Sequence, residues 1–260
     1  MNKLIIPIIF IVIIIAGIGA YFIFQKPAFS EMNGDMPYYF IAIHNEPHNS
    51  EPEGRKKIEQ SYAILKKMVK KADEYNIKLT LMFTAQCADY ISESPERTTE
   101  FEKWKKHGHE IAAHHHSIYH ANWDGYTNYT KEEAEAQRIK QGKIPPEEYL
   151  GTFDDYIKKL KKLNPNTHSG CMNAEDKKEM PDEIYYDTCS GFANHGEPGK
   201  REGDNTTPEK GKNEYITVGV YKNITRKWLA HYQTTLDRRQ QKAQEVFNSM
   251  NSGVYGSVNH

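Results

Sequence analysis

The sequence predicts an α/β fold, a distorted (β/α) barrel of about seven strands. Short apolar runs of strand length alternate with longer segments of helical periodicity between Tyr38 and His260. Such alternation is typical of parallel strands joined by right-handed crossovers, with the helices outside the sheet. Potential metal-ligating side chains follow two of the apolar runs directly, as functional residues do at the carboxyl ends of barrel strands.

The first part of this domain has the clearest pattern. Residues 38–44 are aromatic and β-branched and predict a buried strand. Residues 55–75 place apolar side chains at helical spacing with Lys on the opposite face, which predicts an amphipathic helix ending at Asn76. Strands at 77–83 and 110–113, with a helix at 95–106 between them, complete a β-α-β-α-β order.

The second half continues the pattern less regularly. Helices are expected at 131–140, 147–163 and 227–250, and strands at 167–172, 184–189, 215–221 and 253–258. Residues 194–213 are rich in Gly, Pro and charge, and predict a solvated loop. Thr152 begins a Thr-Phe-Asp-Asp run, but apolar residues continue at helical spacing, so Asp154 and Asp155 are expected on a solvated helix face.

The amino terminus predicts a membrane anchor. Residues 4–24 are almost entirely apolar, and about 20 such residues span a bilayer as a helix. A cleaved signal peptide is disfavoured, because Ile18 stands three positions before a cut after Ala20. Lys3 favours a cytoplasmic amino terminus, which would place the domain outside the cell. The expected organisation is an anchor at 1–26, a linker at 27–37 and the barrel domain at 38–260, in a single-pass protein of the cell membrane.

Charge and cysteine content restrict the partners. The chain has 34 Lys and Arg against 35 Asp and Glu, so its near-neutral charge provides no field to hold nucleic acid. Of the three cysteines, Cys171 and Cys189 lie in short apolar stretches and could be bridged in an oxidising compartment. No Cys-x-x-Cys pattern predicts a zinc cluster.

Histidines mark the expected functional site. Six of the 12 His fall between His107 and His120. The first strand runs into His44 and Glu46, and the third runs into His114 and the histidines that follow. Because parallel strands end at the same rim, a carboxylate and two or three imidazoles can converge there on one ion, with a coordination position left open. Such an ion lowers the pKa of a bound water and polarises a carbonyl. A non-metal role for the cluster remains the alternative.

Two segments carry a family resemblance. The first is residues 62–83, in which a helix runs through Asn-Ile-Lys into the second strand, and the second is residues 104–114, which contain Gly-His-Glu-Ile-Ala-Ala-His. Both resemble stretches of the NodB-like polysaccharide deacetylases. The similarity covers about 38–120. It implies a distorted barrel, a divalent metal held by Asp and two His, and hydrolysis of N- or O-acyl groups on carbohydrate. Zinc is the expected metal, with cobalt or nickel as alternatives.

The family's metal motifs can be placed on this chain. Its H-[S/T]-x-x-H pair resembles the run from His116 to His120, whereas counting from Gly108 puts the first His at His114 and Ile118 at the second position. The family's T-F-D-D-G motif falls where this chain has Ile-His-Asn-Glu-Pro, without Asp. The resemblance therefore implies Glu46, His116 and His120 as metal ligands, with His114 as an additional or replacement ligand.

The remaining site roles follow from the same resemblance. His44 is expected to be the base or a further metal ligand, and His260, at the end of the last strand, is expected to assist the leaving group. Tyr119, Trp123 and Asp124 are expected near the substrate at the rim, where aromatic rings can stack on sugars, although ordinary packing would also explain the rings.

These observations together predict a membrane-anchored, extracytoplasmic, metal-dependent hydrolase that removes N- or O-acyl groups from carbohydrate. The alternatives are a glycosidase-type hydrolase of a related barrel and a carbohydrate-binding pseudoenzyme that has lost the catalytic Asp. A binding pseudoenzyme would keep sugar binding after loss of the metal, whereas an enzyme would not.

Overall fold

The structure is a computed structural model that describes residues 38–48, 52–142, 149–174, 177–188, 216–221, 224–229, 232–233 and 254–259. The predicted anchor and linker, the predicted loop at 194–213, and His260 lie outside these residues. Within the described residues, no helix combines the length and apolar character needed to cross a membrane.

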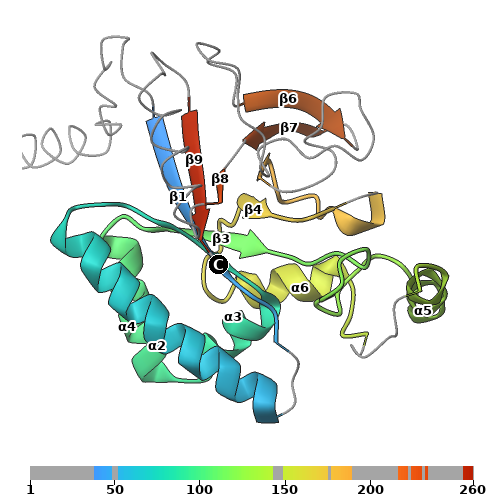
Figure 1. Ribbon diagram of the computed structural model, residues 1–260, viewed down its shortest axis with the longest axis horizontal. Helices are drawn as coiled ribbons and strands as arrows, with labels where there is room; N and C mark the ends of the chain where they lie inside the picture. Colours follow the sequence, from blue (N-terminus) through green and yellow to red (C-terminus); the bar gives the residue numbers. More distant parts are fainter. Residues whose placement is uncertain are drawn as a thin grey trace, which may run out of the picture. The chain divides into compact units, whose positions relative to one another are not determined.

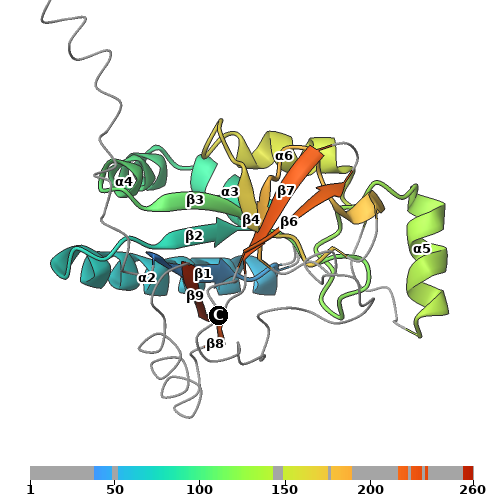
Figure 2. The same cartoon turned by 90° about the horizontal axis from the view of Figure 1, so that it is seen from above.

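One sheet organises the described part of the chain. Its nine strands lie in the order β6-β7-β5-β4-β3-β2-β1-β9-β8, and the sheet curls into a half-barrel with helices flanking it (Figures 1 and 2). The strands are β1 (Tyr38–Asn45), β2 (Thr80–Phe83), β3 (Glu110–His114), β4 (Ser169–Cys171), β5 (Tyr186–Asp187), β6 (Ile216–Tyr221), β7 (Ile224–Leu229), β8 (Tyr232–Gln233) and β9 (Val254–Asn259). All neighbours are parallel except β6 and β7. The α/β prediction is confirmed at this level.

The helices are α2 (Pro52–Glu74), α3 (Ala85–Ser92), α4 (Pro95–Lys106), α5 (Lys131–Lys140) and α6 (Phe153–Leu160), with a 3₁₀ turn, η1, at Lys177–Glu179. The amphipathic pattern in α2 is confirmed, because its predicted apolar positions are buried. Asn76, in the left-handed region at φ 54°, follows its end. Pro95 starts α4 behind the cap formed by Ser94, whose hydroxyl accepts a hydrogen bond from the Arg97 N–H.

The main core lies between the helices and one face of the sheet. Side chains of α2, α3, α4 and α6 pack there against alternate strand residues such as Leu81, Phe83 and Ile111. The opposite face carries a smaller apolar cluster around Ala42, Met82 and Cys171. This alternation follows from the period of two in a strand, and it points His44 and His114 away from the helices.

Several expected boundaries are corrected. The predicted helix at 227–250 is wrong over its first part, because residues 224–229 form β7, which pairs antiparallel with β6. Tyr232 and Gln233 form β8, and residues 234–250 lie outside the described part. The backbone of β7 is paired with β6 along its whole length, and this pairing outweighs the local helical spacing.

Two further elements differ from the expectation. A helix not expected from the sequence, α3, is capped by Thr84, whose side chain accepts a hydrogen bond from the Cys87 N–H. The predicted helix at 147–163 is shorter in the described residues, because α6 begins after Thr152, which forms a capping box with Asp155. Asp154 and Asp155 are exposed helix residues, as predicted, and they lie in the first turn of α6.

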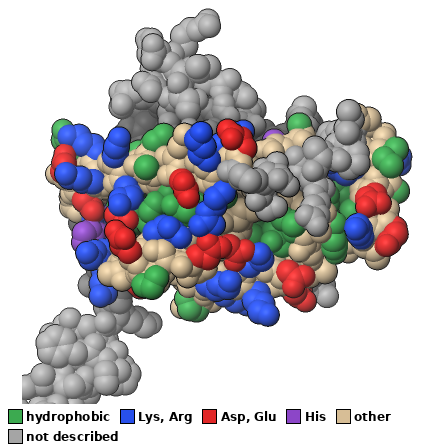
Figure 3. Space-filling model, turned by 90° about the horizontal axis from the view of Figure 1, so that it is seen from below, with side chains coloured by type: hydrophobic (Ala, Val, Ile, Leu, Met, Phe, Trp, Pro, Cys, Tyr) green, Lys and Arg blue, Asp and Glu red, His purple; other side chains and the backbone are tan. Residues whose placement is uncertain are grey.

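The surface seen in Figure 3 mixes Lys and Arg with Asp and Glu, and hydrophobic side chains lie between them. Ion pairs connect neighbouring helices, for example Arg55 with Glu93 at 2.7 Å and Lys66 with Glu100 at 3.2 Å. Exposed pairs of this kind stabilise a fold only slightly. This face presents no extended patch of a single charge.

Candidate metal centre

The carboxyl ends of β1 and β3 bring a carboxylate and two imidazoles together. Both strands run parallel to β2, which lies between them, so the residues that follow them meet at one rim. Glu46 follows β1, His114 ends β3, and His116 lies two residues beyond it. One potential ligand atom from each of these three residues lies within 4.8 Å of the others. The predicted convergence of carboxylate and imidazoles at this rim is therefore present.

The carboxylate of Glu46 faces both imidazoles with different oxygens. Its Oε2 lies 3.1 Å from His116 Nε2, and its Oε1 lies 3.6 Å from His114 Nε2. Both histidine side chains are buried, whereas that of Glu46 is 29% exposed. One carboxylate and two imidazoles form a ligand set found in catalytic zinc sites, in which a fourth position is left for water or substrate. The donor set thus fits a divalent ion.

Extended backbone explains which histidines belong to the group. Successive side chains of an extended chain point to opposite sides, so residues two apart share a side. His114 and His116 accordingly face Glu46, while His115 points to the helical side and contacts Phe153 and Tyr156. Three consecutive histidines in an extended segment therefore predict that the first and third lie on one side and the second on the other.

A backbone carbonyl fixes the tautomer of His116. Its Nδ1–H donates to the Asn122 carbonyl oxygen at 2.9 Å, which leaves the Nε2 lone pair directed towards Glu46. The Asn122 side chain in turn donates to the Pro47 carbonyl oxygen at 3.3 Å, which joins this loop to the segment after β1. Partners of this kind orient metal-ligating imidazoles.

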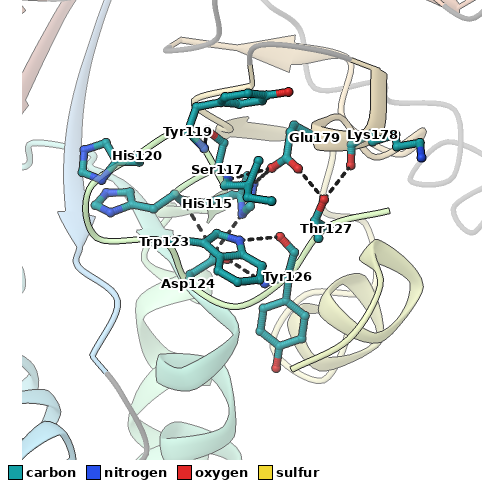
Figure 4. A network of polar contacts seen from close by, with 12 residues as sticks. His115, Ser117, Tyr119, His120, Trp123, Asp124, Tyr126, Thr127, Lys178 and Glu179 are labelled. Atoms are coloured by element: carbon teal, nitrogen blue, oxygen red, sulfur yellow. Dashed lines mark hydrogen bonds and ion pairs between the residues drawn. The ribbon is translucent and has the colours of Figure 1, made fainter. Parts of the chain in front are cut away.

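His115, between His114 and His116 in the sequence, is the centre of a buried charged network (Figure 4). Its Nδ1 lies 2.8 Å from Asp124 Oδ2, and its Nε2 lies 3.1 Å from Glu179 Oε2. Burial opposes the charged imidazole, but the charges and hydrogen bonds of Asp124 and Glu179 outweigh it and raise the pKa of His115 to about 9. His115 is therefore an imidazolium at neutral pH, and it donates to both carboxylates.

The same carboxylates hold the backbone of the loop that carries the histidines. Asp124 accepts from the N–H groups of His116 and Tyr126 at 3.3 and 3.1 Å. Glu179, contributed by η1, accepts from the Ile118 N–H at 3.1 Å and from the Thr127 hydroxyl. Burial raises the pKa of Glu179, against the hydrogen bonds that it accepts. The loop is thus tied from both sides to a single buried imidazolium.

Two further side chains that the sequence did not single out support the loop. Arg138 of α5, 1% exposed, donates to the carbonyl oxygens of Ile118, His120 and Ala121 at 3.0, 2.6 and 3.3 Å. The Tyr156 hydroxyl donates to the His114 carbonyl oxygen at 2.6 Å. Arg138 and Glu179 come from distant segments that resemble ordinary solvated helix and loop, so nothing local in the sequence marks them.

His120, a predicted ligand, lies outside the Glu46, His114 and His116 group. Its ring centroid lies 4.0 Å from that of His116, but its Nδ1 accepts a hydrogen bond from the Asn122 N–H at 3.1 Å. The residues between the two histidines form a turn rather than a helix, so the four-residue spacing does not align their ligand atoms. The structure brings His114 and His116 together beside Glu46.

His44 lies beside His114. The two ring centroids are 4.3 Å apart, and His44 is buried. With Cys171 these histidines form a second group whose potential ligand atoms also lie within 4.8 Å. Cys171 is disulfide-bonded, and Cys87 is a buried free cysteine. Cys189, the bridging partner suggested by the sequence, lies outside the described residues.

The residues predicted to contact substrate have mainly structural contacts. Asp124 is 2% exposed and is occupied by the His115 network. Trp123 is buried, and its indole N–H donates to the Tyr126 carbonyl oxygen at 3.0 Å. The Tyr119 hydroxyl lies 3.0 Å from that of Tyr129, and the ring is partly buried. Asp124 and Trp123 therefore belong to the interior of the loop rather than to its outer surface.

His260, predicted to assist the leaving group, lies outside the described residues, although the strand before it, β9, pairs with β1. None of the family models, curated proteins or solved structures compared with this chain matches it.

Proposed function

We propose that this protein is a metal-dependent hydrolase in which Glu46, His114 and His116 bind one divalent ion. The observation that carries the proposal is the convergence of these three side chains at the carboxyl rim of a parallel sheet. Zinc best suits a set of two imidazoles and one carboxylate, with cobalt or nickel as substitutes. When bound, such an ion would polarise an acyl carbonyl and lower the pKa of water.

The chain's own groups supply orientation and proton transfer. The Asn122 carbonyl holds the His116 ring, and the Tyr156 hydroxyl holds the backbone of His114. His44, buried beside His114, is the proposed proton acceptor for the attacking water. His260 is the proposed group that protonates the leaving group.

The proposed substrates are N- or O-acylated carbohydrates, as the resemblance to NodB-like polysaccharide deacetylases implies. The proposed location is the cell membrane, with the catalytic domain on the extracytoplasmic side. The disulfide at Cys171 supports this location, because structural disulfides persist mainly in oxidising compartments.

Metal content tests this proposal most directly. The full-length chain is incubated with zinc, freed of excess metal and analysed for bound metal, and it is also assayed for acetate release from acetylated oligosaccharides. Near-stoichiometric zinc is expected in the wild type and in His120→Ala, with loss in Glu46→Gln and His116→Ala. His168→Ala, which changes an exposed histidine, is the matched control. A wild-type chain that binds no zinc, cobalt or nickel would refute the hydrolase proposal.

One observation favours a carbohydrate-binding protein without catalysis as a second candidate. The family's Asp pair is absent, and Asn45, at the end of β1, uses its side-chain amide to donate to the Met82 carbonyl oxygen at 2.9 Å. In that case oligosaccharide binding would persist after metal removal with EDTA, and no acyl group would be released. Calorimetric titration with and without EDTA distinguishes the two candidates.

A further inference from the structure

A second set of metal-ligating side chains lies beside the proposed metal centre. It consists of His44, one residue before the end of β1, and of His114 and Cys171, which end β3 and β4. One potential ligand atom from each of these residues lies within 4.8 Å of the others. All three residues are buried. His114 belongs to both sets, so the two potential ion positions are neighbours.

The sheet fixes this second set. Cys171 is the register partner of His114 across β3 and β4, and its carbonyl oxygen accepts from the His115 N–H at 2.9 Å. On the far side, the Met172 N–H donates to Asp187 Oδ1 at 2.9 Å, and Asp187 is fully buried. These hydrogen bonds hold the backbone on either side of the cysteine, and none of them involves its sulfur.

The state of Cys171 decides whether this set can bind an ion. A thiolate is a zinc ligand, whereas a sulfur in a disulfide lacks the charge that makes it one. Of the two sets found among the described residues, only that of Glu46, His114 and His116 keeps three potential ligands in the disulfide-bonded chain. Reduction would add a soft sulfur ligand to two buried imidazoles.

We propose that reduction of the Cys171 disulfide creates a second metal site, formed by His44, His114 and Cys171, that competes with the hydrolytic centre for its ion. This inference rests on the proposed function, because the two sites share His114. The ligand class is a thiophilic divalent ion such as zinc or cobalt, for which two nitrogens and one thiolate are favourable donors.

The redox step is a thiol–disulfide exchange with a dithiol donor. The donor's two thiols become a disulfide, and their two electrons and two protons convert the Cys171 disulfide into two thiols. On metal binding the Cys171 thiol releases its proton to solvent, and the sulfur–metal bond replaces the S–H bond.

The expected consequence is a withdrawal of the ion from the rim. Glu46 is partly exposed, while His44 and Cys171 are buried, so the second site lies deeper in the protein. An ion held by the second set no longer polarises a substrate at the first. In an oxidising compartment the disulfide form is the resting, hydrolytic state, and reduction switches it off.

Cobalt spectroscopy tests the proposal without an activity assay. The full-length chain is prepared oxidised, and separately reduced under anaerobic conditions with a phosphine, which takes up an oxygen atom from water to become the phosphine oxide as the disulfide is reduced. After removal of the reductant, cobalt is added to both. We expect visible d–d absorption in both samples and an intense near-ultraviolet sulfur-to-cobalt charge-transfer band only in the reduced sample.

Variants assign the band to its ligands. Cys171→Ala and His44→Gln should lose the reduced-state band, and His44→Gln does so without removing the cysteine. Cys87→Ala, which changes a buried cysteine outside both groups, should retain it. Glu46→Gln should lose cobalt binding in the oxidised chain and keep the band in the reduced chain, since Glu46 belongs only to the first set.

Three results would overturn the proposal. The first is a disulfide that the phosphine does not reduce, as thiol counting would show. The second is a reduced chain with no charge-transfer band. The third is a band that persists in Cys171→Ala or His44→Gln. Failure of the proposed hydrolase gives a different pattern, because the oxidised wild type then binds no cobalt while the reduced chain still shows the band.

Discussion

The buried imidazolium of His115 makes the stability of the fold depend on pH in a specific direction. Its pKa is raised from the ordinary 6.5 to about 9 by Asp124 and Glu179, in spite of burial. A group with a raised pKa in the folded state stabilises that state fully below its unfolded pKa, and this contribution is lost as the pH rises through the folded value. One pKa unit corresponds to about 1.4 kcal/mol, so the shift corresponds to roughly 3 kcal/mol. The free energy of unfolding should therefore fall by about 3 kcal/mol between pH 6 and pH 10 on account of this group.

The assay is urea unfolding of the EDTA-treated chain, followed by circular dichroism at pH 6, 8 and 10. His115→Gln should be less stable than the wild type by about 3–5 kcal/mol at pH 6, because it leaves two buried carboxylates without their cation. This difference should shrink towards pH 10. His168→Gln, at an exposed histidine, serves as the control and should follow the wild type. Glu179→Gln removes one carboxylate and should move the loss to lower pH. A difference between wild type and His115→Gln that is the same at pH 6 and pH 10 would refute the reasoning.

Three further substitutions test how the loop and its neighbours are held. Arg138→Met should lower the free energy of unfolding by about 3 kcal/mol, because it removes a cation that donates to three loop carbonyls. Urea unfolding at pH 7 measures this, and an effect below about 0.5 kcal/mol would contradict the assigned contacts. Tyr156→Phe should lower the free energy of unfolding by about 1 kcal/mol, because the His114 carbonyl loses its hydrogen bond. It should also weaken zinc binding, measured by competition with a chelator. Unchanged zinc affinity would show that this hydrogen bond does not affect the proposed metal site. Asp155→Ala should cost about 1 kcal/mol through loss of the α6 capping box, whereas Asp154→Ala should have a smaller effect; equal effects of the two substitutions would contradict the capping role.

The network around His115 is better suited to fixing a geometry than to maximising stability. Burying an imidazolium between two carboxylates carries a desolvation cost that apolar packing of the same volume would avoid. In return, Asp124 and Glu179 accept backbone N–H groups at both ends of the loop that starts at His114. The backbone of His116 is thus held by a carboxylate outside the Glu46, His114 and His116 group.

Local pattern determined a large part of this protein. The order of strand and helix from residue 38 to residue 114 follows from periods of two and 3.6 residues, which depend on neighbours in sequence alone. The placement of Glu46 near the histidines follows from the same pattern, because parallel strands end at a common rim. That His114 and His116 share one side of the chain also follows from the sequence, because side chains two residues apart in an extended segment point the same way.

The tertiary structure alone decided the rest. Residues 227–229 were expected to begin a helix, but they belong to β7, because pairing with β6 and β5 satisfies backbone groups on both of its edges. His120 has the spacing of a metal ligand, yet the turn that contains it points its Nδ1 at the Asn122 N–H. Glu179 and Arg138 reach the site from 61 and 20 residues beyond Ile118, respectively. Such contacts depend on how distant segments pack, and sequence periodicity reports only which face of an element is buried, not which groups it meets there.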